Sequence, residues 1–205
     1  MSNHLDRFTL PPPYDFAVTA AAAHYYTTLG VYRAGRFRRA LRAGDGLALV
    51  ELANAGTPDA PAVDAFVLAR QGDVDDASLH TRIRAMLNPH LDLGTFYAQA
   101  RADARLWPVV APLSGLGLLA TETMFEAIAV TIIEQQIALS AAQRAERWLV
   151  VWADEGIDYQ GERYRAFPSA GRLAAATVED LTPLKITFRR MNVLIEMAQM
   201  ETEHS

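Results

Sequence analysis

The segment from Phe125 to Ser140 constrains the fold of this chain more than any other stretch. Its first half has apolar residues at the spacing i, i+3, i+4, i+7, i+8, which is typical of a helix with one buried face: Phe125, Ile128, Ala129, Ile132 and Ile133. Thr123 and Glu126 have the spacing of a capping box, which predicts where this helix begins. A polar Gln135-Gln136 pair then interrupts the pattern, and a second helical stripe follows at Ala142, Ala145, Trp148, Leu149 and Trp152. The sequence therefore predicts two helices joined by a short polar turn.

Length and composition limit the class of protein. The chain has 205 residues, of which 51% are hydrophobic and 21% charged, so we expect a globular protein of two modest domains. No stretch approaches the ~18 apolar residues of a membrane-spanning helix, and the N-terminus lacks the apolar core of a secretory signal. The absence of cysteine excludes disulfides and thiolate-ligated metals. We expect a cytoplasmic location, and the net charge of −5 argues weakly against DNA as a partner.

The residue pattern changes from strand-like to helical near residues 88–95. Before this point, β-like runs alternate with turn signals, which predicts a domain of residues 1–88 with an antiparallel sheet flanked by helices. The expected helices are residues 16–26, with Asp15 as N-cap, and residues 73–86. The expected strands are a run at residues 8–10, residues 31–41 with a kink at Gly35, residues 47–52 after the hairpin signal Gly44-Asp45-Gly46, and residues 62–69.

From Asn88 onward the pattern is almost wholly helical, and we expect residues 89–205 to form a second, all-helical domain. A short helix is predicted over residues 95–104, an irregular connection over 106–119 and a loop over 159–167. Thr177 and Asp180 have the spacing of another N-terminal cap. A third apolar stripe predicts a final helix and consists of Phe188, Met191, Leu194, Ile195 and Ala198.

Four motifs occur in an order that resembles one family of enzymes. They are Pro12-Pro13-Tyr14-Asp15, the stretch 125–139, Ala166-Phe167-Pro168-Ser169 followed by Leu173-Ala174-Ala175-Ala176, and the segment 189–198 with its opening basic pair. Each motif is weak alone, but together they resemble the DNA-3-methyladenine glycosylase II family of the helix-hairpin-helix DNA glycosylase superfamily. The resemblance covers nearly the whole chain and corresponds to the N-terminal two-thirds of the family. It implies an α+β fold, in which a TBP-like antiparallel sheet with flanking helices precedes an all-α, incomplete helix-hairpin-helix glycosylase domain.

The resemblance also implies a function in base-excision repair. Such enzymes bind double-stranded DNA containing alkylated bases, flip a 3-methyladenine-like base out of the duplex and hydrolyse its N-glycosidic bond. The position that matches the intercalating side chain of the family is Gln136, beside Gln135, which would hold the turn, and Ile137. The competing interpretation is a solvated turn between two helices. No cofactor or metal is expected, because the histidines have no metal-ligand spacing: His24, His80, His90 and His204.

The turn departs from the family pattern at two positions. Glu134 stands where the family usually has glycine, and its carboxylate would lie close to the expected path of DNA phosphates. Ala138 stands where the family tends to have serine, so a helix cap is lost. Neither departure abolishes the interpretation of Gln136 as an intercalating residue.

We expect no catalytic residue in this chain. In the family, a Gly-x-Gly hairpin and then a catalytic aspartate follow the helix that matches residues 189–198. Gly115-Leu116-Gly117 precedes the intercalating helices and is followed by no basic residue, and all candidate aspartates also come too early: Asp154, Asp158 and Asp180. We therefore expect a fragment that is inactive alone and able to self-associate through exposed apolar faces. The alternatives are a non-catalytic DNA- or protein-binding scaffold and one half of a split glycosylase.

Two further groups of side chains could contact nucleic acid. An arginine cluster could bind phosphate, although a solvated strand face is the favoured interpretation; it consists of Arg33, Arg36, Arg38, Arg39 and Arg42. Trp148 and Trp152 could stack on a base, but their helical spacing favours a place in the core.

Overall fold

The computed structural model describes residues 3–204, and the chain divides into two compact units between Ala120 and Thr121. The boundary between the two units thus lies about 30 residues after residue 88, where the sequence pattern changes from strand-like to helical. The reason is that α3 (Leu93–Ala102), α4 (Trp107–Val110) and the 3-10 helix η1 (Ala111–Leu113) belong to the first unit. None of the helices within residues 3–204 is long and apolar enough to cross a membrane.

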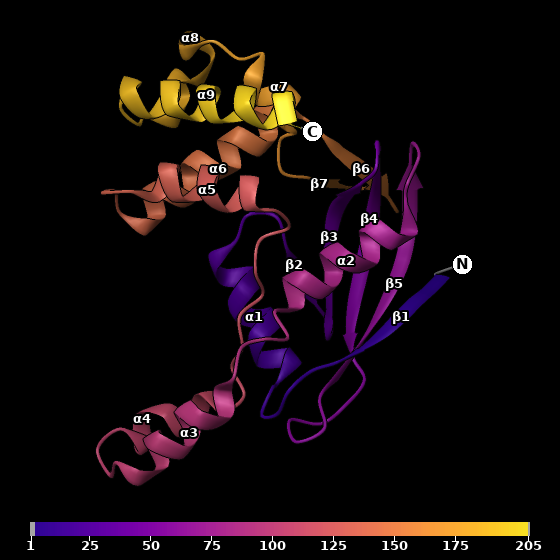
Figure 1. The fold of residues 1–205 in the computed structure, drawn as a ribbon, viewed down its shortest axis with the longest axis vertical. Coiled ribbons are helices and arrows are strands. Elements are labelled where there is room, and N and C mark those ends of the chain that lie inside the picture. Colours follow the sequence, from indigo (N-terminus) through magenta and orange to yellow (C-terminus); the bar gives the residue numbers. More distant parts are fainter. Residues whose placement is uncertain (1–2, 205) are drawn as a thin grey trace. The chain divides into compact units, whose positions relative to one another are not determined.

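Five antiparallel strands form the sheet of the first unit (Figure 1). They are β1 (Asn3–Thr9), β2 (Val31–Arg33), β3 (Arg36–Ala43), β4 (Gly46–Asn54) and β5 (Ala62–Gln71), in the order β1-β5-β4-β3-β2. The central strand β4 is buried along nearly its whole length. The predicted antiparallel sheet is therefore confirmed, and β1 is longer than the run at residues 8–10 indicated.

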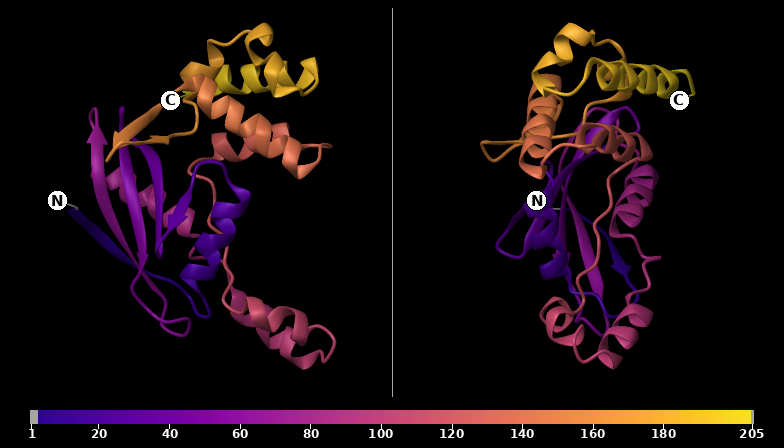
Figure 2. Two further views of the ribbon diagram at one scale, coloured as in Figure 1. Left: turned by 180° about the vertical axis from the view of Figure 1, so that it is seen from behind. Right: turned by 90° about the vertical axis from the view of Figure 1, so that its left-hand side faces the viewer.

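Helices α1 (Phe16–Tyr26) and α2 (Asp76–Leu87) pack on one face of this sheet (Figures 1 and 2). The N-cap prediction for α1 is confirmed, because the Asp15 carboxylate accepts hydrogen bonds from the backbone N–H groups of Ala17 at 2.9 Å and Val18 at 3.1 Å. The core between helices and sheet joins Phe16, Leu79, Ile83 and Leu87 to Phe37, Leu41, Val50, Leu52 and Val63.

The prediction of one kinked strand over residues 31–41 is wrong, since β2 and β3 are the two strands of a hairpin. The turn is Ala34-Gly35, and both residues have positive φ, 48° and 75°, as a two-residue type I′ turn requires. Alanine rarely adopts this conformation, so the sequence carries no clear signal for the turn. The neighbouring hairpin at Gly44-Asp45, between β3 and β4, has the glycine signal and is confirmed.

Helices α3 and α4 lie side by side and apart from the sheet (Figures 1 and 2). Residues 106–119, predicted as an irregular connection, thus contain α4 and η1 before the chain becomes extended. The Tyr97 hydroxyl ties this region together, because it donates to the Leu113 carbonyl at 2.8 Å and accepts from the Gly115 N–H at 2.9 Å.

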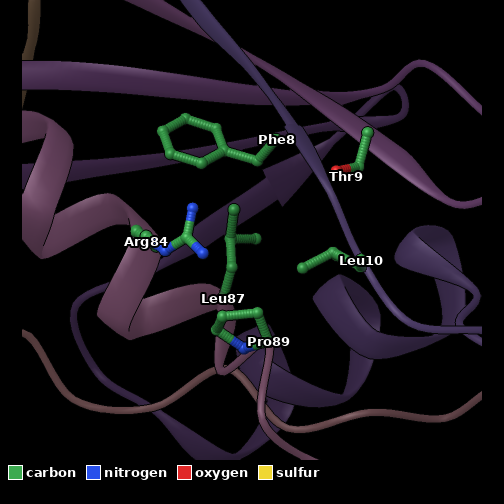
Figure 3. Close-up of a pocket in the computed structure, with 6 residues that line it drawn as sticks. All are labelled: Phe8, Thr9, Leu10, Arg84, Leu87 and Pro89. Carbon is green, nitrogen blue, oxygen red and sulfur yellow. The ribbon is translucent and has the colours of Figure 1, made fainter.

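Figure 3 shows a small pocket where the end of β1 meets the end of α2. It is lined by Phe8, Thr9, Leu10, Arg84, Leu87 and Pro89 and has a volume of about 10 Å³. A cavity of this size holds about one water molecule. It is therefore a gap in the packing rather than a ligand site.

The second unit begins with the predicted helix pair, α5 (Met124–Glu134) and α6 (Leu139–Ala153). The remaining elements are β6 (Gly156–Tyr159), β7 (Glu162–Arg165), α7 (Ala170–Ala174), α8 (Val178–Leu181), the 3-10 helix η2 (Thr182–Leu184) and α9 (Phe188–His204). Helix α9 packs against α5 and α7, and α6 packs against η2.

The expectation that this part of the chain is all-helical, with a loop over residues 159–167, is wrong, since β6 and β7 form a two-stranded antiparallel sheet. The turn is Gln160-Gly161, with φ of 52° and 79°. An ion pair across the strands, Arg163 to Asp158 at 2.8 Å, stabilises the hairpin. Strands of four residues are too short to produce a clear alternating pattern in the sequence.

Most residues of the three predicted apolar stripes are buried, but Ile128 and Phe188 are 42% and 68% exposed. Met191 and Leu194 of the third stripe are only 2% and 0% exposed. Met191 and Leu194 therefore contribute nothing to the exposed apolar faces expected for self-association, and within the stripe only Phe188 is exposed.

Candidate nucleic-acid interface

The Gln135-Gln136 turn lies between α5 and α6 and has an unusual backbone. Gln135 is the C-cap of α5, and its N–H donates to the Thr131 carbonyl at 3.1 Å. Gln136 adopts the left-handed conformation with φ of 57°. For a residue other than glycine this conformation costs ~1–2 kcal/mol, and such strain concentrates at functional sites.

The side chains of this turn face solvent. Glu134, Gln135 and Gln136 are exposed and Ile137 is half-buried. The predicted polar turn between two helices is therefore confirmed, and Gln136 lies at its exposed tip. Its role in intercalation stays a prediction, because a solvated turn would have the same exposure.

Arg190 is the residue near this turn that sequence reasoning did not single out. Its Nη2 donates to Gln136 Oε1 at 3.4 Å, across 54 positions of sequence. This distance exceeds the usual range for an N–H···O bond, so the interaction orients the carboxamide weakly. The signal in the sequence was the basic pair Arg189-Arg190 at the start of α9, which only the family resemblance picks out.

Both departures from the family pattern are visible in the structure. Glu134 is the last residue of α5, so its exposed carboxylate stands at the negative end of the helix dipole. Ala138 is the N-cap of α6 and supplies no side-chain hydrogen bond, whereas a serine there would add about 1 kcal/mol of stability.

The start of α5 is fixed by an altered capping box. The Thr123 hydroxyl accepts a hydrogen bond from the Glu126 N–H at 3.0 Å, as predicted. The Glu126 carboxylate accepts from the Glu122 N–H at 2.9 Å instead of from Thr123. Glu126 is 4% exposed, so this bond satisfies a carboxylate that would otherwise be costly to bury.

The motif Ala166-Phe167-Pro168-Ser169 packs against α5 and begins α7. The Phe167 ring packs edge-on against Phe125 of α5, with 6.1 Å between ring centroids. Ser169 is the N-cap of α7, and its hydroxyl donates to Glu155 Oε1 at 2.7 Å. The motif therefore anchors the helix that carries the turn and exposes no chemistry of its own.

The Gly115-Leu116-Gly117 segment cannot grip a phosphate, because its backbone amides have internal partners. Gly115 N–H donates to the Tyr97 hydroxyl, and Gly117 N–H donates to Thr19 Oγ1 at 2.8 Å. A Cβ atom at Gly117 would lie 2.3 Å from Cε2 of Tyr14. These glycines therefore allow the chain to dock on the Pro-Pro-Tyr-Asp segment.

The arginine cluster of the first unit is not a single phosphate site. Arg38 Nε binds Glu51 Oε2 at 2.7 Å, and Arg36 Nη1 lies 3.6 Å from Glu51 Oε1. Arg39 points to the opposite face and is only 4% exposed. The favoured interpretation of a solvated strand face holds for Arg36 and is wrong for Arg39.

Trp148 and Trp152 are half-buried instead of lying in the core. Their rings stack on each other, with 6.0 Å between centroids and 21° between planes. The Arg172 guanidinium covers the Trp152 ring at 4.0 Å. A guanidinium that stacks on an indole in this way leaves both groups at the surface.

The aspartates of the second unit have structural roles. Asp158 pairs with Arg163, and Asp180 completes the capping box of α8 with Thr177. The backbone N–H and hydroxyl of Thr177 hold the pKa of the Asp180 carboxyl below its usual range. Across the described residues, no group of three His, Asp or Glu side chains could hold a metal ion.

Comparison with known proteins gives one relative in sequence and several in fold. No family model matches the chain. The DNA-3-methyladenine glycosylase of Bacillus subtilis is 30% identical over 109 residues, which are 53% of this chain and 36% of that protein. The chain thus aligns with little more than a third of the length of this curated relative.

Two solved structures share the fold. The 3-methyladenine DNA-glycosylase from Archaeoglobus fulgidus matches with a TM-score of 0.74 and 19% identity, over 94% of this chain and 66% of that one. The 8-oxoguanine glycosylase/lyase of Clostridium acetobutylicum, in complex with double-stranded DNA containing cytosine opposite 8-oxoG, matches with a TM-score of 0.65 and 15% identity, over 100% and 66%. Similarity in sequence to one DNA-3-methyladenine glycosylase and in fold to another thus confirms the resemblance of this chain to these enzymes, over the part of them that it covers.

Proposed function

We propose that this chain binds double-stranded DNA and inserts Gln136 into the space left by a flipped base, as part of a base-excision repair glycosylase that acts on alkylated, 3-methyladenine-like bases. The observation that carries the proposal is the exposed position of Gln136, held in a left-handed conformation between two helices. In this proposal the five-stranded sheet is the TBP-like domain of the family. The second unit is then the leading part of its helix-hairpin-helix domain.

A glutamine suits the space left by a flipped base. Flipping costs a few kcal/mol of lost stacking and pairing, and an inserted side chain recovers part of that cost. The carboxamide has two N–H donors and an acceptor oxygen, so it can pair with whichever edge the unpaired partner base presents. Gln135, one residue earlier, remains with α5 and keeps the turn in place.

Arg190 supports this insertion electrostatically. Its long bond to Gln136 is weak enough to break when the carboxamide enters the stack. The freed guanidinium then stands beside the duplex, where it can form charge-assisted bonds to a phosphate. Glu134 opposes binding, but its exposed side chain can turn into solvent, where salt screens the repulsion.

The hydrolysis itself requires a carboxylate that stabilises the positive charge developing on the sugar. No position of this chain matches the catalytic aspartate of the family, and Asp158 and Asp180 are held by structural partners. We therefore propose that residues 1–205 bind and distort DNA but release no base by themselves.

The proposal is tested with a duplex that carries 2-aminopurine at the flipping site, because this base fluoresces when it leaves the stack. The wild-type chain is expected to increase the fluorescence, and Gln136→Ala to remove most of the increase. Gln199→Ala is the matched control, since Gln199 is also an exposed glutamine, on α9. An increase of the same size with Gln136→Ala would refute the role of Gln136.

A base-release assay on methylated DNA with the same protein tests the chemical part. Release of alkylated base by residues 1–205 would show that a catalytic carboxylate lies within this chain. DNA binding without any change in 2-aminopurine fluorescence would instead favour the non-catalytic scaffold.

A further inference from the structure

A groove lies in the second unit, directly after Gln136 along the chain. It has a volume of about 260 Å³ and is bounded by the turn and α6 on one side and by η2 on the other. Its lining consists of Ile137, Ala141, Arg144, Ala145, Trp148, Pro183, Leu184 and Lys185. We call it the α6–η2 groove.

The lining of the α6–η2 groove combines three kinds of chemistry. Its surface is mostly apolar, it includes the half-buried indole of Trp148, and it carries two exposed cations, Arg144 and Lys185. No carboxylate lines it. An aromatic surface with cations beside it and no acidic group matches the chemistry of a nucleotide, which has an aromatic base and a phosphate.

The two cations are available for a ligand. Neither the Arg144 guanidinium nor the Lys185 ammonium forms a hydrogen bond or ion pair with any other residue in the part of the chain that the structure describes. This is unexpected, because residues 121–205 contain thirteen Asp and Glu but only eight Lys and Arg. Two cations that remain unpaired in an acidic unit, on one groove, form a local anion-attracting site.

The backbone of Lys185 adopts the left-handed conformation. Lys185 has φ of 57° and ends η2, with its N–H donating to the Thr182 carbonyl at 3.0 Å. Glycine or asparagine is the usual residue at such a left-handed position. Lys185 is also the only lysine among 205 residues. A strained conformation at a charged residue is a reason to look for a role of its side chain.

Trp148 is held in place for stacking. Its ring stacks on Trp152, which is covered in turn by the Arg172 guanidinium at 4.0 Å. This row of stacked groups restricts the rotation of the Trp148 indole, and the indole still lines the groove. A base that stacks on a ring already fixed in orientation loses less of its binding energy to ordering the side chain.

We propose that the α6–η2 groove binds one nucleotide of a DNA strand, with the base on Trp148 and the phosphate between Arg144 and Lys185. The proposal rests on the proposed function and extends it, because the groove begins at Ile137, the residue after the intercalating Gln136. Its volume is near the lower end of ligand pockets, about 300 Å³. The groove therefore accommodates a single nucleotide unit beside the turn rather than a longer segment.

The charge-neutral double variant Arg144→Gln/Lys185→Gln tests the phosphate contacts. Each phosphate contact contributes about 0.9 to the slope of log affinity against log salt concentration, so loss of two should lower that slope by about 1.8. Between about 50 and 200 mM salt, the wild type should therefore lose affinity for duplex DNA roughly tenfold more steeply than the double variant. Arg147→Gln is the matched control, because Arg147 is an exposed arginine of α6 that does not line the groove.

The fluorescence of Trp148 tests the stacking contact. In a Trp107→Phe/Trp152→Phe background Trp148 is the only tryptophan, and we expect duplex DNA to quench it, with no quenching when Arg144→Gln/Lys185→Gln is added. Thermal unfolding of each variant verifies that the fold is kept. Quenching by free deoxynucleotide at the same concentration as by duplex would overturn the assignment to a DNA strand.

The outcomes separate this inference from the function on which it rests. A wild-type chain that binds no duplex DNA would overturn the proposed function, and the groove assignment with it. A wild-type chain that binds DNA, with an unchanged salt slope in the double variant and unquenched Trp148, would overturn the groove assignment alone.

Discussion

The Pro12-Pro13-Tyr14-Asp15 region of the first unit and the Gln135-Gln136 turn of the second use their polar groups in opposite ways. In the first unit, Asp15 caps α1, and the amides of Gly115 and Gly117 are bonded to Tyr97 and Thr19. In the second unit, the polar side chains of the Gln135-Gln136 turn are exposed, and Arg190 alone makes a weak bond to Gln136. A motif shared with a family can thus stabilise the fold or form a contact surface. The two roles are distinguished by whether the polar groups of the motif are bonded within the protein or exposed to solvent.

The charges show the same contrast. The first unit has eleven basic and eleven acidic residues, and its Arg36 and Arg38 share ion pairs with Glu51. The second unit is more acidic, yet Arg144 and Lys185 remain unpaired on the α6–η2 groove. The net charge of a unit is therefore a poor guide to whether it can bind an anion, because net charge does not show which cations lack an acidic partner.

The first prediction compares Gly117, which packs against Tyr14, with Gly171, which has open space around it. Gly117→Ala places a Cβ 2.3 Å from Tyr14 and should lower the free energy of unfolding of the first unit by about 1–3 kcal/mol. Gly171→Ala in α7 is the control, because nothing lies within 4 Å of the added atom, and alanine there should be neutral or stabilising. Urea unfolding measures both, followed by hydrogen exchange of β3 and β4 for the first unit and of α7 and α9 for the second. Equal effects would break the contrast between the units.

A second prediction uses the pH dependence of the first unit. Burial raises the pKa of the Tyr14 hydroxyl to about 12, from 10.0 in the unfolded chain. The folded state therefore keeps this proton while the unfolded state releases it, so the contribution is complete below about pH 10 and is lost as pH rises toward 12. The full loss is about 2–3 kcal/mol.

Tyr14→Phe should remove this part of the alkaline decrease in unfolding free energy, measured by urea unfolding between pH 9 and pH 12. Tyr25→Phe, which changes a ring that is 70% exposed, should leave it in place. An alkaline decrease that persists unchanged in Tyr14→Phe would contradict the assignment.

The smallest expected effect on stability has the opposite sign and lies in the second unit. Gln136→Gly should stabilise this unit by about 0.5–1 kcal/mol, because glycine adopts the left-handed conformation without strain. The same variant should abolish the 2-aminopurine signal. Gln135→Gly is the control, since Gln135 has φ of −53° and glycine there should destabilise instead. Stabilisation without loss of the DNA signal would mean that the turn is merely a strained connection.

Local signals in the sequence predicted much of the fold. Asp15, Thr123 and Thr177 each mark the start of a helix, because a side chain that caps a helix acts on the backbone two or three residues away. The Ala34-Gly35 turn and the β6–β7 hairpin were missed. Each turn has the expected glycine only at its second position, whereas Ala34 and Gln160 are unusual at the first, so the sequence signal is weak and strand pairing fixes the conformation.

The candidate site was predicted only in part, because some of its contacts join residues that are far apart in the sequence. The exposed tip at Gln136 follows from the end of one helix and the start of the next, which are both local patterns. Its bond to Arg190 and the α6–η2 groove bring together residues about 40 to 54 positions apart, such as Ala145 and Lys185. Sequence spacing contains no periodic signal for such contacts.

The bond between Gly117 and Thr19 also sets a condition on the biosynthesis of the first unit. It joins residues 98 positions apart, and β1 pairs with β5 across a shorter but still large separation, with Asn3 opposite Val67. Contacts between distant residues slow folding, because the chain must close long loops before these contacts form. During synthesis, β1 therefore remains without its partner strand until residues 62–71 have left the ribosome, and Thr19 of α1 remains without Gly117 for longer. In this interval the unpaired backbone edge of β1 is open to wrong partners.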